Sequence, residues 1–198
     1  MIQLNSLVVG YDKPLFDPIN VTFNDNTIYG ILGKSGCGKS TLLRTIAGLN
    51  KQMSGSVIKD DASIPYMMHQ RYTNFDWLSC LDNVLIAERS RFKRRKLQDD
   101  AVDVLKKVGL GEYLDRYPTE LSGGMQQRLA LARVLFAKPK VLLMDEPLSA
   151  LDDRTRAVMQ QLILDCHKET KNIILMVTHS VDEAQKMCDH IINLNGGN

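Results

Sequence analysis

Eight residues with the spacing G-x-x-x-x-G-K-S, from Gly33 to Ser40, could hold a chain of phosphates. Glycines let backbone N–H groups converge on phosphate oxygens, and a helix that starts at the end of the loop adds the positive end of its dipole. Lys39 would neutralise the β- and γ-phosphates, and the Ser40 hydroxyl would bind Mg²⁺. A purely structural glycine loop is the alternative, which the strand–loop–helix context disfavours. The predicted ATP-binding residues of this phosphate-binding loop (P-loop) are Gly33, Lys34, Ser35, Gly36, Cys37, Gly38, Lys39, Ser40 and Thr41.

Two consecutive carboxylates, Asp145 and Glu146, follow the apolar run 141–144. Ligands of open α/β sheets bind at the carboxyl ends of the strands, which is where both side chains should emerge. Asp145 would then hold Mg²⁺ through water, and Glu146 would orient or deprotonate an attacking water. Many strands end in acidic turns, so the pair is a weak signal alone. Together with the P-loop upstream, the pair predicts ATP hydrolysis.

The elements that must position these residues follow from apolar runs of strand length and from helical periodicity. The continuously apolar run 141–144 is typical of a parallel strand that is buried on both faces. Alternation of strands with helices predicts an α/β core with a parallel sheet. We expect strands at 2–9, 19–23, 27–32, 56–59, 64–68, 141–144, 173–178 and 190–194, and helices at 39–47, 154–168 and 181–187, with a mainly helical stretch at 81–137.

Composition sets limits on the class of protein. The chain has 198 residues, 44% of them hydrophobic and 24% charged, and a net charge of +2, which gives no global field for a nucleic acid. No run approaches 18 apolar residues, and no signal peptide is visible at the start. The basic run 89–96 is interpreted as a solvated linker, with contact to anionic lipid headgroups as the alternative. The scattered cysteines indicate reduced thiols in a cytosol: Cys37, Cys80, Cys166 and Cys188.

The segment 121–128, LSGGMQQR, resembles the signature sequence of ATP-binding cassette (ABC) ATPases, and it precedes the two carboxylates as it does in that family. Further matches occur in the family's order. Tyr11 is similar to the aromatic that stacks on adenine, although an ordinary surface tyrosine is the alternative. Gln70 resembles the glutamine that meets Mg²⁺ and the attacking water. The stretch 149–152 resembles the D-loop, and His179 resembles the switch histidine.

The resemblance covers nearly the whole chain and implies one domain, 1–198, with a P-loop (RecA-like) parallel-sheet core, an N-terminal antiparallel β subdomain and an inserted helical subdomain at about 71–137. It implies that Glu146, His179, Gln70 and Lys39 are catalytic, and that Ser40, Gln70 and Asp145 hold Mg²⁺. In the family, two cassettes face each other and each signature covers the partner's γ-phosphate. The nucleotide contacts implied beyond the P-loop are Tyr11, Ser122, Gly123, Gly124, Gln126 and Asp152.

Finer features, among them Trp77 and the stretch 82–84, resemble bacterial importer ATPases, most closely the nitrate/sulfonate/taurine group. The resemblance implies a homodimer or heterodimer of ATPase subunits at the cytoplasmic face of the membrane. Its partners would be membrane permease subunits and an extracytoplasmic solute-binding protein, with a small anion or organic solute as cargo. An export-type or a non-transport ABC ATPase is the alternative. Ser180 stands where Asp is common. The sequence stops where most importer ATPases continue, so we expect no regulation through a C-terminal segment.

Overall fold

The computed structural model describes residues 1–60, 64–69, 74–87 and 94–194. The chain forms two compact units. We call them the sheet unit, which comprises Met1–Met67, Pro139–Pro147 and His167–Asn198, and the helical unit, which comprises Met68–Lys138 and Leu148–Cys166. The prediction of one domain with a helical subdomain at about 71–137 remains a prediction.

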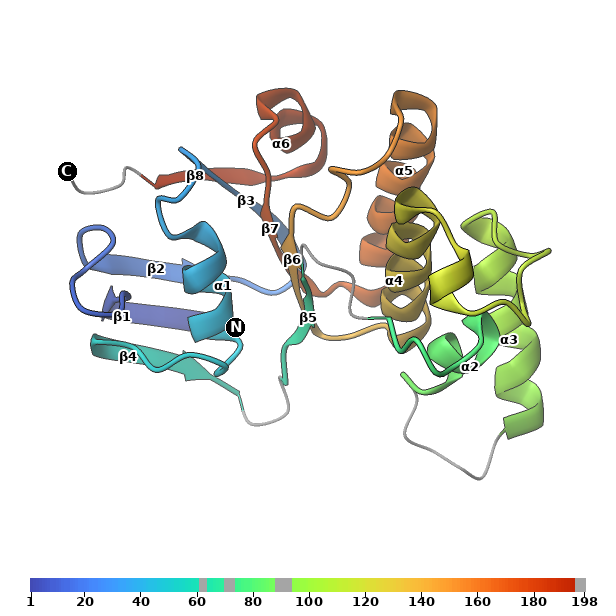
Figure 1. Cartoon of the computed structure of the whole chain (residues 1–198). Helices are drawn as coiled ribbons and strands as arrows, with labels where there is room; N and C mark the ends of the chain where they lie inside the picture. Colours follow the sequence, from blue (N-terminus) through green and yellow to red (C-terminus); the bar gives the residue numbers. More distant parts are fainter. Residues whose placement is uncertain (61–63, 70–73, 88–93, 195–198) are drawn as a thin grey trace. The chain divides into compact units, whose positions relative to one another are not determined.

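The sheet unit contains a five-stranded sheet in the order β5-β6-β7-β3-β8 (Figure 1). The strand β3 pairs in parallel with β7 on one side and β8 on the other, and β6 pairs in parallel with β7. The sequence-based fold class, an α/β protein with a parallel sheet, is therefore confirmed. The strands are β3 (Thr27–Gly33), β5 (Tyr66–Met68), β6 (Val141–Asp145), β7 (Ile173–Val177) and β8 (His190–Leu194).

An antiparallel sheet of three strands, in the order β2-β1-β4, belongs to the same unit. These strands are β1 (Ile2–Val8), β2 (Ile19–Phe23) and β4 (Ser54–Lys59). One apolar core joins side chains of this sheet to α1 (Lys39–Ile46) and to the five-stranded sheet. All five residues of β6 and of β7 are buried, and for β6 the continuously apolar run 141–144 predicted this. The short helix α6 (Val181–Met187) packs against β3.

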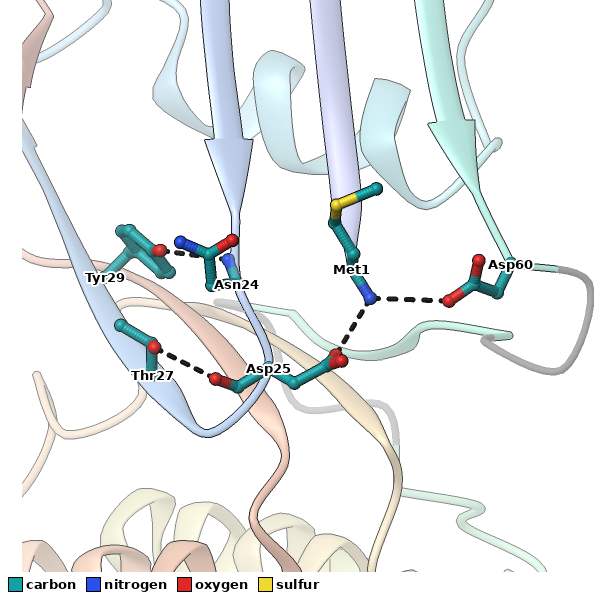
Figure 2. A network of polar contacts seen from close by, with 6 residues as sticks. All are labelled: Met1, Asn24, Asp25, Thr27, Tyr29 and Asp60. Atoms are coloured by element: carbon teal, nitrogen blue, oxygen red, sulfur yellow. Dashed lines mark hydrogen bonds and ion pairs between the residues drawn. The ribbon is translucent and has the colours of Figure 1, made fainter.

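The amino terminus ties three segments of this unit together (Figure 2). The Met1 ammonium lies 2.8 Å from Asp25 Oδ1 and 3.4 Å from Asp60 Oδ2, and the hydrogen bond to Asp25 raises the pKa of the ammonium. Nearby, the backbone N–H of Asn24 donates to the Tyr29 hydroxyl at 3.0 Å. The ion pairs are exposed, so the buried Tyr29 stabilises the turn more than they do.

The helical unit consists of helices that pack on one another. The helix α2 contacts α3 and α4, and α3 contacts α4. Asn83, fully buried on α2, is satisfied by hydrogen bonds to the backbone of Phe75, Leu78 and Ser79, and it thereby fixes the preceding loop. The elements are α2 (Cys80–Leu85), α3 (Arg94–Lys107), the 3₁₀-helix η2 (Pro118–Glu120), α4 (Gly123–Ala137) and α5 (Asp153–Thr170), whose last turn lies in the sheet unit.

Two thiols make the stability of the fold sensitive to alkaline pH. Burial raises the pKa of Cys80 to about 11, aided by Glu120, and burial raises the pKa of Cys188 to about 12, aided by Glu183 and Asp189. A thiol whose pKa is higher in the folded than in the unfolded chain stabilises the fold below the unfolded value of about 9. This stabilisation is lost as the pH rises from about 9 toward the folded values.

We therefore expect the free energy of unfolding, measured with urea, to fall between pH 8.5 and pH 10.5. The fall should be smaller in Cys188→Ala, because that variant no longer has to keep this thiol neutral. Cys166→Ala is the matched control, since it removes another thiol of intermediate burial from the same chain. An equal pH dependence in Cys188→Ala and in the wild type would contradict the assignment.

Candidate functional site

The P-loop connects β3 to α1 within the sheet unit. Gly38, the N-cap of α1, has φ 103°, and Gly36 has φ 76°, both in the left-handed region that favours glycine. A Cβ at Gly38 would also approach Leu15 Cδ1 to 2.9 Å. Glycine is thus favoured by the backbone path at Gly36 and Gly38, and Lys34, Ser35 and Gly36 at the apex are exposed.

Lys39 is the cation of this loop and is 5% exposed. Its Nζ donates to the carbonyl oxygens of Gly33 and Lys34, each at 2.9 Å. These bonds hold the ammonium against the backbone of the loop that leads into α1. A buried cation in such surroundings is positioned to bind an anion.

Two of the three side chains predicted to hold Mg²⁺ are in contact. Ser40 Oγ donates to Asp145 Oδ1 at 2.9 Å, although 105 positions separate them in the sequence. Asp145 is the last residue of β6 and is 2% exposed, so its carboxylate is held rigidly beside α1. One hydroxyl and one carboxylate are the hard oxygen ligands that Mg²⁺ accepts from a protein when phosphates and water complete its shell. The residues therefore fit the ion.

Glu146 and His179 form a second pair in the sheet unit. His179 Nε2 contacts Glu146 Oε1, and the side chains are 47% and 15% exposed, respectively. Glu146 has φ 52°, a left-handed conformation that is strained for a side-chain-bearing residue. Its backbone N–H donates to Val177 O at 3.0 Å, which fixes this turn against the end of β7.

The signature residues lie at the start of α4 in the helical unit. Ser122 is the N-cap, and its Oγ accepts from Met125 N at 3.3 Å. Ser122 and Gly123 are exposed at the N-terminus of a 15-residue helix, an arrangement that suits an anion. The Gln126 amide instead donates to Pro118 O at 3.0 Å and to Leu121 O at 3.3 Å, so it holds the loop before α4. A nucleotide contact by Gln126 stays a prediction.

The D-loop packs on this helix. Ala150 N donates to Oε1 of the buried Gln127 at 3.1 Å, and a Cβ at Gly124 would lie 3.4 Å from Ala150 O. Asp152 Oδ1 accepts from Thr155 N at 3.0 Å, which caps α5, and this bond lowers the pKa of the carboxyl group. The nucleotide role of Asp152 remains a prediction beside this structural one.

The structure gives fewer contacts for the remaining predicted residues. Tyr11 is 70% exposed, which leaves its ring accessible to the adenine of a nucleotide. Gln70 lies outside the described residues. Among those described, no cluster of three or more His, Cys, Asp or Glu side chains gathers as a metal site. Two other histidines have structural partners: His167 Nδ1 lies 2.9 Å from Asn172 Oδ1, and the His190 ring stacks on Tyr29.

Sequence reasoning did not single out Thr178 or Glu183, which flank His179 and hydrogen bond to each other. The sequence did contain a signal for Glu183. Ser180 and Glu183 have the S-x-x-E spacing of a capping box, which indicates that a helix begins directly after His179. The partner of Thr178 could not be read from that spacing.

Comparison with known proteins adds a family and solved structures. Residues 16–149 match the family described as "ABC transporter". The chain is 39% identical over 186 residues to the aliphatic sulfonates import ATP-binding protein SsuB 1 of Agrobacterium fabrum, covering 94% of this chain and 67% of that protein. It is 38% identical to the spermidine/putrescine import ATP-binding protein PotA of Haemophilus influenzae, covering the whole of this chain but 56% of that relative.

Two solved structures of the cassette MJ0796 resemble the fold. Its dimeric structure has a TM-score of 0.87 at 28% identity, and a dimeric post-hydrolysis state bound to ADP and Pi has a TM-score of 0.84 at the same identity. Each comparison covers 98% of this chain and 94% of the other.

Proposed function

Because this chain belongs to the ABC transporter ATPase family, we propose that it is the nucleotide-binding subunit of a transporter, which hydrolyses Mg–ATP and couples the reaction to a separate membrane permease. The observation that carries the proposal is the assembly, within the sheet unit, of Lys39 in the P-loop, the Ser40–Asp145 pair and the Glu146–His179 pair. These are a phosphate-binding cation, two metal ligands and a base with its partner.

Each group has one task in this proposal. Lys39 neutralises charge on the β- and γ-phosphates, and the loop N–H groups orient them. Ser40 and Asp145 would hold Mg²⁺, which would supply positive charge against the charge that develops on the transferred phosphoryl group. Glu146 accepts a proton from the attacking water or orients it. His179 holds the Glu146 carboxylate in place through its Nε2 contact.

A second copy completes the site in this proposal. The exposed N-terminus of α4, at Ser122 and Gly123, would cover the γ-phosphate bound by the partner's P-loop. The dimeric structures of the similar cassette MJ0796, one with ADP and Pi, support this arrangement. ATP then joins the two copies, and its hydrolysis releases them.

Import is the favoured direction because SsuB 1 and PotA, by their names, are import ATP-binding proteins. In the part of the chain that the structure describes, no helix has the length and apolar character needed to cross a bilayer. A permease would supply that crossing, with the subunit on its cytoplasmic side and a solute-binding protein outside the membrane. The cargo would be a small anion or another organic solute.

An exposed aromatic loop supports contact with such a permease. Trp77 is 73% exposed, and its ring lies 5.3 Å from the ring of Phe75, centroid to centroid. Phe75 is held by the Arg133 guanidinium at 4.6 Å and by hydrogen bonds to Asn83. A rigidly held, water-exposed tryptophan is a typical anchor of a protein interface.

The proposal is tested by Lys39→Ala, which removes the cation from the P-loop. We expect the affinity for ATP, measured by calorimetry with Mg²⁺, to fall about 10- to 100-fold, since hydrogen bonds to a charged group contribute about 1.5–3 kcal/mol. Circular dichroism should show that the fold survives. Lys51→Ala, at an exposed lysine of the same unit, is the control and should bind ATP normally. Unchanged affinity in Lys39→Ala would refute the nucleotide site.

A further inference from the structure

The turn that carries His179 is closed by side chains that have not yet been given a role. The strand β7 ends at Val177 and α6 begins at Val181, so residues 178–180 form the whole connection. Ser180 is the N-cap of α6, and its Oγ accepts from Glu183 N at 3.1 Å. This bond is one half of a capping box.

A threonine changes the other half of this capping box. In a capping box the Glu183 carboxylate would accept directly from the Ser180 N–H. Here Ser180 N donates to Thr178 Oγ1 at 3.1 Å, and Thr178 Oγ1 donates in turn to Glu183 Oε2. The hydroxyl is therefore inserted between the N-cap and the carboxylate. Thr178 and Glu183 are 4% and 7% exposed, so water competes weakly with these bonds.

The inserted hydroxyl fixes the backbone on both sides of His179. Before the histidine, Thr178 N donates to Ile31 O at 3.3 Å, which attaches the turn to β3. After it, the N–H of Ser180 is held by the Thr178 side chain. The His179 side chain remains half-exposed and reaches Glu146. A small rotation of this turn would move the imidazole away from that carboxylate.

We propose that Thr178 and Glu183 are positioning residues for His179 in ATP hydrolysis, an inference that rests on the proposed function. Their buried hydrogen bond sets the direction from which the imidazole meets Glu146. Neither residue is assigned a contact with ATP, so their loss should act on turnover and leave nucleotide affinity unchanged.

The decisive variants are Thr178→Val, which keeps the shape of the side chain but removes the hydroxyl, and Thr178→Ser, which keeps the hydroxyl. In Thr178→Val we expect kcat for ATP to fall roughly tenfold, because small misplacements of a reacting group are costly, with KM within about twofold. Thr178→Ser should restore most of the turnover. Glu183→Gln, which keeps an acceptor oxygen, should retain more turnover than Glu183→Ala.

Two controls distinguish a positioning role in hydrolysis from a role limited to the stability of the fold. Tyr29→Phe removes one hydroxyl from another buried side chain of the same unit, and it should lower the unfolding free energy without lowering kcat. In the His179→Ala background, Thr178→Val should cause no further loss of turnover, because its effect passes through the histidine. Additive losses, or wild-type kcat in Thr178→Val, would overturn the inference.

Amide hydrogen exchange gives a readout that does not depend on activity. In Thr178→Val the peptide spanning 178–183 should exchange faster than in the wild type, and in Thr178→Ser it should not. Equal exchange in all three proteins would also overturn the inference. A wild-type chain without ATPase activity would refute the proposed function instead, and the exchange data would still decide whether the hydroxyl holds the turn.

Discussion

Replacing Glu146 with Gln should lower ATP turnover by about 10²- to 10⁴-fold while leaving ATP affinity close to that of the wild type, because a general base contributes about this factor and does not hold the phosphates. Gln is isosteric with Glu and tolerates φ 52° no worse, so the backbone of this turn should be kept. Its amide cannot accept a proton from water. Steady-state hydrolysis and calorimetry measure the two effects separately.

The same variant should form a stable dimer with Mg–ATP, because the nucleotide that joins the two copies would persist. Size-exclusion chromatography with light scattering would show the dimer only when ATP is present. Glu112→Gln, at an exposed carboxylate of the helical unit, should hydrolyse ATP normally. Turnover near the wild-type rate in Glu146→Gln would remove Glu146 from the role of base.

Ser122→Arg should abolish ATP-driven dimerisation while ATP still binds to the monomer. The arginine would fill the space that the partner's γ-phosphate needs at the start of α4, whereas the P-loop and Tyr11 lie in the other unit and are unchanged. Calorimetry measures monomer affinity, and light scattering measures association. Arg128→Lys provides a control on the same helix, since its guanidinium binds Val108 O and Gly109 O within the helical unit.

A mixture of Ser122→Arg and Lys39→Ala proteins sharpens the experiment. In a head-to-tail pair, one composite site carries both changes and the other carries neither, so partial hydrolysis should return if one intact site suffices. If Ser122→Arg alone weakens monomer binding as much as Lys39→Ala does, both motifs belong to the pocket of a single chain. The head-to-tail arrangement would then be wrong, together with the transport mechanism built on it.

The sequence predicted the fold where one local pattern determines one element. The apolar run 141–144 became β6, buried at every position, and the glycine spacing of the P-loop placed a strand before it and α1 after it. The stretch 81–137 was predicted only as helical. It contains separate helices because the chain turns at Gly109, with φ 72°, and at Pro118, which begins η2. Side-chain periodicity alone does not resolve such breaks.

The site was predicted as residue types but not as contacts. A motif indicates that Ser40 and Asp145 serve the same ion, yet only the sheet order brings them to 2.9 Å. Nothing local predicts the left-handed backbone of Glu146, which arises where β6 leaves the sheet beside β7. The insertion of Thr178 into the capping box of α6 likewise depends on a buried environment that a single sequence does not reveal.

The order of the five-stranded sheet has a consequence for how the chain folds during its synthesis on the ribosome. The strand β3 carries the P-loop, but its two neighbours, β7 and β8, come from the last quarter of the chain. The loop that binds phosphate is therefore made early and lacks its supporting strands until residues 173–194 have emerged. Closing so long a loop is slow. A nascent chain should acquire nucleotide affinity only after residues 173–194 have emerged from the ribosome, and until then its unpaired β3 edge would be a site for chaperone binding.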